Sequence, residues 1–491
     1  MISLKNVTYF YQNHKKPSIK NINMDIKKGE FVVLTGNSGC GKTTITRVIN
    51  GLAQKFYEGE LSGQVLVNNF DISKKKLWEL GKDIGSVFQD PKSQFFATLV
   101  EDEVAFGCEN YGINENEIDN RVYEALDMVN GLNLSGKELF SLSSGEKQKV
   151  AIASISALNP DIYVFDEPSA NLDMYSVEQL KQMLEYLKEL GKTILISEHR
   201  LYYLKDLADK YIYMKDGQIK YRWNKEEVDN IDAKIWESLG LRHLDLKKID
   251  DLKLNNYNIK NKTCLDIKNL DFNYKKNIIF NKLNLTFKSG EITCITGENG
   301  AGKTTLAKIL CGLLKENGGS LEYNNKPLKY KDRRKISYFV SQNTDCQLFT
   351  ESVAEELLLS NEFIDVKDVL KNYGLEKLIK CHPSTLSGGE RQRLTLAVAE
   401  VIDRDILIFD EPTSGVDKNN MNLISKRLKE LASKGKIIIV ITHDYEFIKE
   451  SCENVVLMNS KEKIENINIF KDSKRLLVSM TRNMGVSVNV L

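Results

Sequence analysis

The chain contains an internal duplication, and this feature limits its possible folds more than any other. GNSGCGKTT at 36–44 returns as GENGAGKTT at 297–305, and IYVFDEPSANLD at 162–173 returns as ILIFDEPTSGVD at 406–417. The blocks keep their order, and the distance between copies changes only from one block to the next, as differences in loop length would cause. Two domains of the same fold are therefore expected.

The repeat divides the chain into four segments. We expect a first domain at 1–224, a linker at 225–262, a second domain at 263–460 and a C-terminal tail at 461–491. The linker mixes spaced apolar residues with charged ones, which predicts that part of it is an amphipathic helix packed on a domain. The sequence assigns no role to the tail.

Composition excludes several classes of protein. Hydrophobic residues make up 42% and charged residues 28%, and 69 Lys and Arg balance 68 Asp and Glu, so a globular protein is expected and nothing favours nucleic acid as a partner. The eight cysteines form no C-x-x-C pair, which argues against zinc and redox motifs and favours reduced thiols in the cytosol. The longest apolar stretch, 437–441, is far shorter than the ~20 residues of a membrane span.

Each copy has the pattern of an α/β domain. FVVLTG at 31–36 and ITCITG at 292–297 are apolar runs that end in glycine, as buried strands do. A glycine-rich segment and an amphipathic helical pattern follow each run. A strand, a tight turn and a helix in this order form the start of a β-α-β unit.

Both glycine-rich segments match the phosphate-binding loop G-x4-G-K-T. Its glycines let backbone N–H groups point at phosphate oxygens, and the N-terminus of the next helix adds a positive dipole. Lys42 and Lys303 are placed to reach the β- and γ-phosphates, and Thr43 and Thr304 offer hydroxyls to Mg²⁺. One match could be an ordinary turn, but two in the same context predict nucleotide binding.

A pair of acidic residues ends a later strand of each copy. Asp166 and Asp410 follow the apolar runs IYVF and ILIF, where a carboxylate helps to hold Mg²⁺. Glu167 and Glu411 come next and can act as general bases that activate water. Asp-Glu-Pro alone could be a turn, but its place after the phosphate loop in both copies favours two hydrolytic sites.

The blocks LSSGE at 142–146 and LSGGE at 386–390 resemble the signature of ATP-binding cassette (ABC) proteins. The resemblance implies an α/β fold of two tandem P-loop domains, each with a mixed sheet core and a helical signature subdomain, and it implies ATP hydrolysis with Mg²⁺. In this family two cassettes pair head to tail and enclose each ATP between the phosphate loop of one and the signature of the other. The two halves of this chain are therefore expected to form such a pair in cis.

The resemblance assigns site residues to matching positions of both copies. The expected ATP contacts of the first copy are Tyr11, Gly36, Asn37, Ser38, Gly39, Cys40, Gly41, Lys42, Thr43, Thr44, Gln89, Ser143, Gly145 and Asp166. Those of the second copy are Tyr274, Gly297, Glu298, Asn299, Gly300, Ala301, Gly302, Lys303, Thr304, Thr305, Gln342, Ser387, Gly388, Gly389 and Asp410. The expected Mg²⁺ ligands are Thr43, Gln89, Asp166, Thr304, Gln342 and Asp410. The expected catalytic residues are Glu167, Glu411, His199 and His443.

Aromatic and histidine positions complete the resemblance. Tyr11 and Tyr274 lie where the family stacks a ring on adenine; the alternative is that both rings face the core. His199 and His443 follow the acidic pair of their own copy at equal distance, and they match the switch histidine of the family. Two histidines at matched spacing favour a functional role over a structural one.

The copies depart from the family pattern at three places. Ser144 replaces the second signature glycine, where a side chain crowds the approach to phosphate. His199 lies in Ser-Glu-His-Arg rather than in the Thr-His-Asp of 442–444, and the second copy reads SGVD after its acidic pair. No catalytic group is lost. Two unequal hydrolytic sites are therefore expected, the slower one using Lys303 and the first signature.

The segment VFQDPKSQFFATLVEDEVAFG at 87–107 is similar to one in the ATPases of energy-coupling-factor (ECF) importers. In those importers it docks a helix of a transmembrane coupling subunit, and a separate small membrane protein captures a vitamin or a metal ion. The second copy keeps matching positions, among them Phe349 for Phe96. The resemblance implies a peripheral subunit on the cytoplasmic side of the cell membrane; the alternative is that the segment is only part of the helical core.

Other cassette proteins remain alternatives. The fused ATPase of another importer, of sugars or peptides, has a similar length, but in sugar importers the second cassette is usually degenerate, and here both are intact. Soluble cassette factors that act on ribosomes normally have a longer charged linker and lack the Q-x4-Q-x-F block. DNA-repair cassette ATPases need large insertions and zinc cysteines. The transported substrate stays open, because the ATPase does not touch it.

Overall fold

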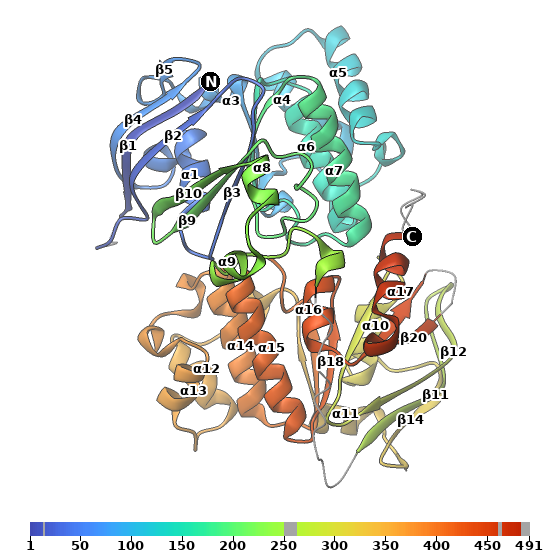
Figure 1. The fold of residues 1–491 in the computed structure, drawn as a ribbon. Coiled ribbons are helices and arrows are strands. Elements are labelled where there is room, and N and C mark those ends of the chain that lie inside the picture. Colours follow the sequence, from blue (N-terminus) through green and yellow to red (C-terminus); the bar gives the residue numbers. More distant parts are fainter. Residues whose placement is uncertain (13–14, 250–262, 460–463, 483–491) are drawn as a thin grey trace. The chain divides into compact units, whose positions relative to one another are not determined.

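The chain separates into two compact units, Met1–Leu244 and Asp245–Leu491 (Figure 1). The computed structural model describes residues 1–12, 15–249, 263–459 and 464–482. Two short helices of the expected linker, α8 (Lys225–Asp229) and α9 (Ala233–Ser238), belong to the first unit. The rest of that linker from residue 250 and the end of the expected tail from residue 483 lie outside the described residues.

The central sheet of the first unit has the strand order β10-β9-β3-β8-β7-β6. Its strands are β3 (Phe31–Gly36), β6 (Ile84–Val87), β7 (Ile162–Asp166), β8 (Thr193–Ser197), β9 (Lys210–Lys215) and β10 (Gln218–Asn224). All pairs are parallel except β9 with β10, so the sheet is mixed. Every residue of β7 and β8 is buried, as expected of parallel strands covered on both faces.

Successive residues of β3 enter two separate cores. Phe31 and Val33 belong to one hydrophobic cluster, and Val32 and Leu34 belong to another. Because successive side chains of a strand point to opposite faces, the two clusters cover opposite faces of the sheet. The cluster of Val32 also contains residues of α1 (Lys42–Ile49) and of a second, antiparallel sheet.

The antiparallel sheet has the order β2-β1-β4-β5. Its strands are β1 (Ile2–Tyr11), β2 (Ile19–Ile26), β4 (Gly59–Val67) and β5 (Phe70–Asp71). The remaining helices of the unit are α2 (Leu52–Lys55), α3 (Leu77–Asp83), α4 (Val100–Asn110), α5 (Glu115–Met128), α6 (Ser144–Ser156) and α7 (Met174–Glu189). Helices α4, α5 and α6 contact one another and form the helical subdomain.

The second unit repeats this architecture. Its mixed sheet has the order β16-β17-β18-β13-β19-β20, and its antiparallel sheet has the order β12-β11-β14-β15. The strands are β11 (Cys264–Tyr274), β12 (Asn277–Lys288), β13 (Ile292–Gly297), β14 (Gly318–Tyr323), β15 (Lys326–Pro327), β16 (Ser337–Val340), β17 (Ile406–Asp410), β18 (Ile437–Ile441), β19 (Asn454–Met458) and β20 (Ile464–Asn468). The expected α/β fold, with two mixed-sheet cores, is confirmed.

The helices of the second unit follow a similar plan. They are α10 (Lys303–Leu310), α11 (Tyr330–Ile336), α12 (Val353–Ser360), α13 (Val366–Asn372), α14 (Gly388–Ile402), α15 (Lys418–Ser433), α16 (Tyr445–Ser451) and α17 (Ile469–Arg482). Helices α12, α13 and α14 form its helical subdomain. The expected tail contains β20, which pairs antiparallel with β19, and α17, which packs on α16.

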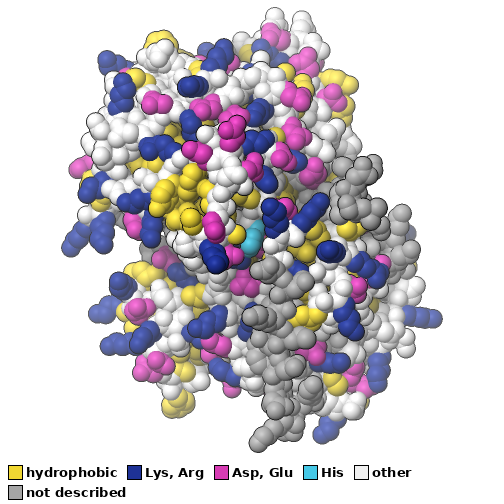
Figure 2. All heavy atoms as spheres, viewed as in Figure 1, with side chains coloured by type: hydrophobic (Ala, Val, Ile, Leu, Met, Phe, Trp, Pro, Cys, Tyr) yellow, Lys and Arg dark blue, Asp and Glu magenta, His cyan; other side chains and the backbone are white. Residues whose placement is uncertain are grey.

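The surface carries charges of both signs. Figure 2 shows Lys and Arg interspersed with Asp and Glu on the visible face, which agrees with a net charge of +1. Within the described part of the chain, no helix has the length and apolar character needed to cross a bilayer.

Candidate active sites

The glycines that open the two phosphate loops cannot be replaced without moving the backbone. Gly36 and Gly297 have φ angles of 143° and 135°. A Cβ on Gly36 would lie 2.2 Å from the carbonyl oxygen of Met214, and a Cβ on Gly297 would lie 1.9 Å from that of Met458. The loops therefore pack directly on the neighbouring strands β9 and β19, with no room for a side chain.

Each loop ends at the N-terminus of a helix. Gly41 and Gly302 precede α1 and α10 in the left-handed conformation, with φ of 104° and 94°. The first N–H groups of a helix have no partner within the helix and favour an anion. The other predicted loop residues, 37–40 and 298–301, lie between these ends.

The two loop lysines have different surroundings. Lys42 Nζ lies 3.1 Å from His199 Nε2 and 3.6 Å from Glu167 Oε1, and it donates to the carbonyl oxygen of Gly36. Lys303 Nζ donates at 2.8 Å to the carbonyl oxygen of Gly297, and again at 2.8 Å to that of Glu298. Both side chains are buried, so each brings a positive charge to its loop at low solvent exposure.

A hydroxyl and a carboxylate meet at the start of each loop helix. Thr43 Oγ1 donates to Asp166 Oδ1 at 3.1 Å, and Thr304 Oγ1 donates to Asp410 Oδ2 at 3.0 Å. Burial raises the pKa of both aspartates. Hard oxygen donors of this kind suit Mg²⁺, which keeps several water or phosphate ligands of its own. Across the described residues, no group of three or more His, Cys, Asp and Glu side chains forms a metal cluster.

Glu167 is the centre of a buried network in the first unit. Its Oε2 accepts a 3.0 Å hydrogen bond from Gln89 Nε2, and its Oε1 lies 3.2 Å from His199 Nε2. Burial opposes ionisation of this carboxyl, but its interactions with His199 and Lys42 lower its pKa to about 2. The group is therefore an anion at neutral pH. The structure thus brings four predicted residues together beyond the ends of β3, β6, β7 and β8: Lys42, Gln89, Glu167 and His199.

The glutamate of the second unit has another partner. Glu411 Oε2 accepts a 3.0 Å hydrogen bond from Thr442 Oγ1, and His443 Nε2 lies 3.8 Å from Glu411 Oε1. Gln342 lines a small cleft with Asp410 and Glu411. Thr442 is not among the predicted residues; its only sequence signal is that it precedes the histidine.

Both glutamates have strained backbones, which the sequence alone does not reveal. Their φ angles are 46° for Glu167 and 50° for Glu411, in the left-handed region. Each N–H donates to the strand carbonyl of the adjacent strand, at Ser197 and Ile441. Such strain in a non-glycine residue occurs often at functional sites. The following proline disfavours the ordinary helical conformation and so contributes a local signal.

The signature serines begin helices of the helical subdomains. Ser143 is the N-cap of α6, and its hydroxyl accepts from Glu146 N while Glu146 Oε2 accepts from Ser143 N. Ser387 and Glu390 form the same capping box at α14. The glutamate of each signature therefore stabilises the first turn of its helix, a role that the sequence analysis did not predict.

The adenine-stacking candidates differ in how firmly they are held. Arg47 of α1 donates to the Tyr11 hydroxyl at 2.9 Å, and its guanidinium lies 3.9 Å from the centre of the Tyr57 ring. Tyr274 packs edge-on against Phe272 and is 46% exposed. The alternative that both rings face the core does not hold for Tyr274.

The segments after Gln89 and Gln342 are held by buried and half-buried polar side chains. Gln94 accepts from Phe88 N at 2.7 Å and donates to Ser86 O at 3.0 Å. Buried Glu103 accepts from the backbone N–H groups of Phe96 and Ala97 at 2.8 and 2.9 Å.

The second unit repeats these bonds. Gln347 accepts from Ser341 N at 2.9 Å and donates to Phe339 O at 2.8 Å, and Glu356 accepts from Phe349 N and Thr350 N. The rings of Phe96 and Phe349 are nevertheless 75% exposed, so the loop is fixed while its aromatic tip faces outward.

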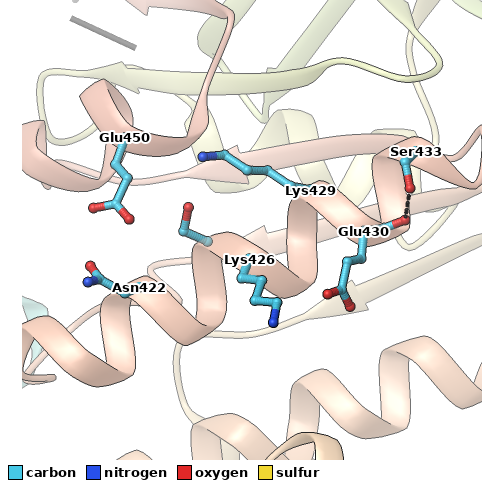
Figure 3. Close-up of a pocket in the computed structure, with 7 residues that line it drawn as sticks. Asn422, Lys426, Lys429, Glu430, Ser433 and Glu450 are labelled. Atoms are coloured by element: carbon cyan, nitrogen blue, oxygen red, sulfur yellow. Dashed lines mark hydrogen bonds between the residues drawn. The ribbon is translucent and has the colours of Figure 1, made fainter. Parts of the chain in front are cut away.

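A polar groove of the second unit lies apart from these residues. It is lined by side chains of α15 and by Glu450 of α16 (Figure 3). Glu450 pairs with Lys418 at 3.0 Å, and Glu430 pairs with Arg427. None of the predicted site residues lines this groove.

Comparison with known proteins identifies the family. Residues 19–170 and 280–414 match the family model of ABC transporters, which together is more than half of the chain. A Treponema denticola protein described as an ABC transporter ATP-binding protein is 40% identical over 478 residues, covering 95% of this chain and 97% of its own.

The chain belongs to the ABC transporter ATP-binding family.

The two units are thus ABC cassettes fused in one polypeptide, and the chain is an ATP-binding and ATP-hydrolysing enzyme. A Clostridium perfringens relative of the same description is 32% identical over 515 residues, covering 94% of this chain and 90% of its own. A structure of ribosome-bound archaeal Pelota and ABCE1 matches with a TM-score of 0.70 at 20% identity, over 97% of this chain and 80% of that chain. At this identity the likeness concerns the fold alone.

Proposed function

We propose that both cassettes hydrolyse Mg²⁺-bound ATP with the residues assembled around Glu167 and Glu411. Lys42 and Lys303 bind the phosphates, because each brings a buried cation to its loop. Each Thr–Asp pair, with Gln89 or Gln342, would hold Mg²⁺, which would supply positive charge that offsets the phosphates. Each glutamate takes the proton of the attacking water. His199 and His443, beside those glutamates, are positioned to sense the γ-phosphate.

We also propose that the cassettes act as a pair within one chain. By the family pattern, Ser143 and Gly145 would contact the ATP held by Lys303, and Ser387, Gly388 and Gly389 would contact the ATP held by Lys42. Each signature serine begins a helix, so backbone N–H groups of the first turn accompany its hydroxyl. Such an arrangement completes both sites without a second copy of the chain.

We propose that this ATPase drives import through a membrane transporter of ECF type. The observation that carries the proposal is the exposure of Phe96 and Phe349 on loops that are otherwise fixed. An exposed aromatic ring costs free energy in water and is favourable once a partner covers it. Phe96 also stacks on Phe106 of α4 at 4.9 Å between ring centres, which makes a paired aromatic surface. A transmembrane coupling subunit would supply the helix that covers it.

Co-expression with membrane subunits encoded beside the gene tests this proposal. The wild-type chain is expected to fractionate with membranes and to co-purify with a coupling subunit and a small substrate-capture protein. The double variant Phe96→Ala/Phe349→Ala should lose this association by at least about tenfold, since two large apolar contacts disappear. Phe363→Ala is the matched control, because its ring is 97% exposed but lies outside the two loops.

Three other results would contradict or change the proposal of ECF-type import. Retention of the membrane partners by Phe96→Ala/Phe349→Ala would show that the loops do not dock them. Co-purification of the wild-type chain with ribosomes in place of membrane subunits would overturn import altogether and favour a soluble cassette factor. A coupling subunit with a sugar or peptide carrier would assign the chain to another importer class.

A further inference from the structure

The residues around the switch histidine of the first cassette form a buried network, and the matching residues of the second cassette are of other types. Glu198, Arg200 and Tyr203 surround His199, and each is at most 8% exposed. The matching positions of the second cassette, aligned on the two histidines, are Thr442, Asp444 and Phe447. These positions carry a hydroxyl, a carboxylate and an apolar ring in place of the carboxylate, guanidinium and phenol of the first cassette.

Glu198 joins two loops through both of its oxygens. Oε1 accepts from the N–H of His199 at 2.7 Å and from the N–H of Arg200 at 3.1 Å. Oε2 accepts from the N–H of Ser169 at 3.3 Å and from the Tyr203 hydroxyl at 2.8 Å. Ser169 lies in the loop between Glu167 and α7, so one carboxylate ties that loop to the backbone of the switch histidine.

Arg200 adds a second tie to the same loop. Its Nη1 donates to the carbonyl oxygens of Ser169 at 3.2 Å and of Leu172 at 3.0 Å. The loop ends at Asp173, which caps α7 by accepting from Ser176 N. Hydrogen bonds to buried charged groups are stronger than neutral ones and costly to leave unmade. Burial and the anion of Glu198 raise the pKa of Tyr203, so its hydroxyl stays a donor.

The second cassette directs the matching side chain elsewhere. Thr442 Oγ1 donates to Glu411 and accepts from the N–H of Asp444 at 3.1 Å. Its hydroxyl therefore bonds to the acidic residue of its own site, whereas Glu198 bonds to the loop at 169–172. Thr442 and Glu198, at matching positions, therefore bond to different parts of their cassettes.

We propose that Glu198 is a positioning residue that makes the switch loop at 198–200 and the loop at 169–173 of the first cassette move as one body. The inference rests on the proposed role of His199 at the first ATP site. Loss of the γ-phosphate there displaces His199, and the shared carboxylate carries that displacement to Ser169 and Leu172. The first cassette then passes its nucleotide state through this carboxylate to the loop before α7.

Hydrogen exchange of the full chain tests the proposal. In a Glu167→Gln/Glu411→Gln background, saturating ATP is expected to slow exchange at 36–44 and at 169–173. Adding Glu198→Gln should reduce the ATP-linked protection at 169–173 roughly tenfold, the effect of one lost hydrogen bond to a charged group, and leave that at 36–44 in place. The triple change Glu198→Thr/Arg200→Asp/Tyr203→Phe installs the residues of the second cassette and should have the same effect.

Controls separate coupling from folding. Tyr203→Phe removes one of the four bonds to Glu198 and should give a smaller loss, whereas Tyr123→Phe, whose ring is 61% exposed on α5, should give none. A merely structural role would lower the unfolding temperature and would speed exchange at 169–173 equally with and without ATP. Unchanged ATP-linked protection in Glu198→Gln would overturn the inference. Absence of protection at 36–44 before any change at Glu198 would overturn the proposed ATP site first.

Discussion

Thr442 donates a 3.0 Å hydrogen bond to Glu411, whereas the corresponding Glu167 accepts its bond from Gln89 at the same distance. The two glutamates share a left-handed backbone and the end of a buried strand, but their side chains are oriented by different loops. The duplication therefore preserved the positions of the acidic residues and changed what holds them.

Replacing both acidic residues should abolish turnover and keep nucleotide binding. Glu167→Gln/Glu411→Gln is expected to lower the rate of phosphate release by ~10²-fold or more, since a general base typically contributes that much. ATP should still bind, because the loop lysines are intact. The measurement is phosphate release beside fluorescent-ATP titration. Glu185→Gln on α7, a surface ion-pair partner of Lys181, is the matched control; retained hydrolysis in the double variant would rule out these bases.

The two signatures offer a test of unequal sites. A Cβ on Gly388 would meet nothing within 4 Å, so Gly388→Ser should change the unfolding temperature by less than about 2 °C. It should nevertheless slow single-turnover hydrolysis, because in the proposed pairing of the cassettes the serine would face the phosphate of the site that uses Lys42. Ser144→Gly should speed the site that uses Lys303.

A contrasting variant shows what steric conflict inside a cassette looks like. A Cβ on Gly145 would lie 2.3 Å from Ser176 Oγ, so Gly145→Ser should lower both stability and activity. If Gly388→Ser leaves single-turnover rates unchanged, crowding at this position does not explain any inequality of the sites.

Arg47 should stabilise nucleotide binding in the first cassette. It holds the Tyr11 hydroxyl and covers the Tyr57 ring, so Arg47→Ala frees both rings. We expect ATP affinity at the first site to fall by roughly three- to tenfold, in line with the loss of a cation–π contact and a hydrogen bond. Site-resolved photolabelling with an azido-ATP measures this. Lys308→Ala, the matching position on α10, is the control, and equal losses in both variants would contradict the expectation.

Glu453 should make stability fall as pH rises. Burial raises its pKa from 4.5 to about 7, although it accepts a 2.7 Å hydrogen bond from the N–H of Ile292. Between these two values the folded chain binds a proton that the unfolded chain has lost. The free energy of unfolding should therefore decrease from about pH 4.5 to about pH 7, by up to roughly 3 kcal/mol, and then level off.

Calorimetry across this range provides the measurement. Glu453→Gln should flatten the decrease, because its side chain has no proton to lose. Glu465→Gln, at a partly exposed ion pair with Arg475, should keep the wild-type slope. Parallel pH profiles for the wild type and Glu453→Gln would show that another group titrates in this window.

The sequence by itself determined the duplication, the α/β class and the phosphate loops. These follow from local patterns: G-x4-G-K-T marks both phosphate loops, which begin at Gly36 and Gly297, and Asp166 and Asp410 end apolar runs, which the fold buries as β7 and β17. The phosphate loop and the acidic residue occur in the same order in both copies, so the assignment in one copy supports that in the other. The sequence also showed the Q-x4-Q-x-F block in both copies, although not that its second glutamine, Gln94 or Gln347, holds the loop by hydrogen bonds.

Only the tertiary structure decided the partners of these residues. Glu198 and Ser169 are 29 positions apart and meet because β7 and β8 are neighbours in the sheet. Likewise, Trp236 of the expected linker is buried in the core of the first unit, and Tyr57 lies beside Arg47 only because the segment before β4 folds back over α1. Motif spacing specifies which residue types are present at a site. Hydrogen bonds between loops depend on how strands align, and that alignment is set by burial of the whole sheet rather than by any local pattern.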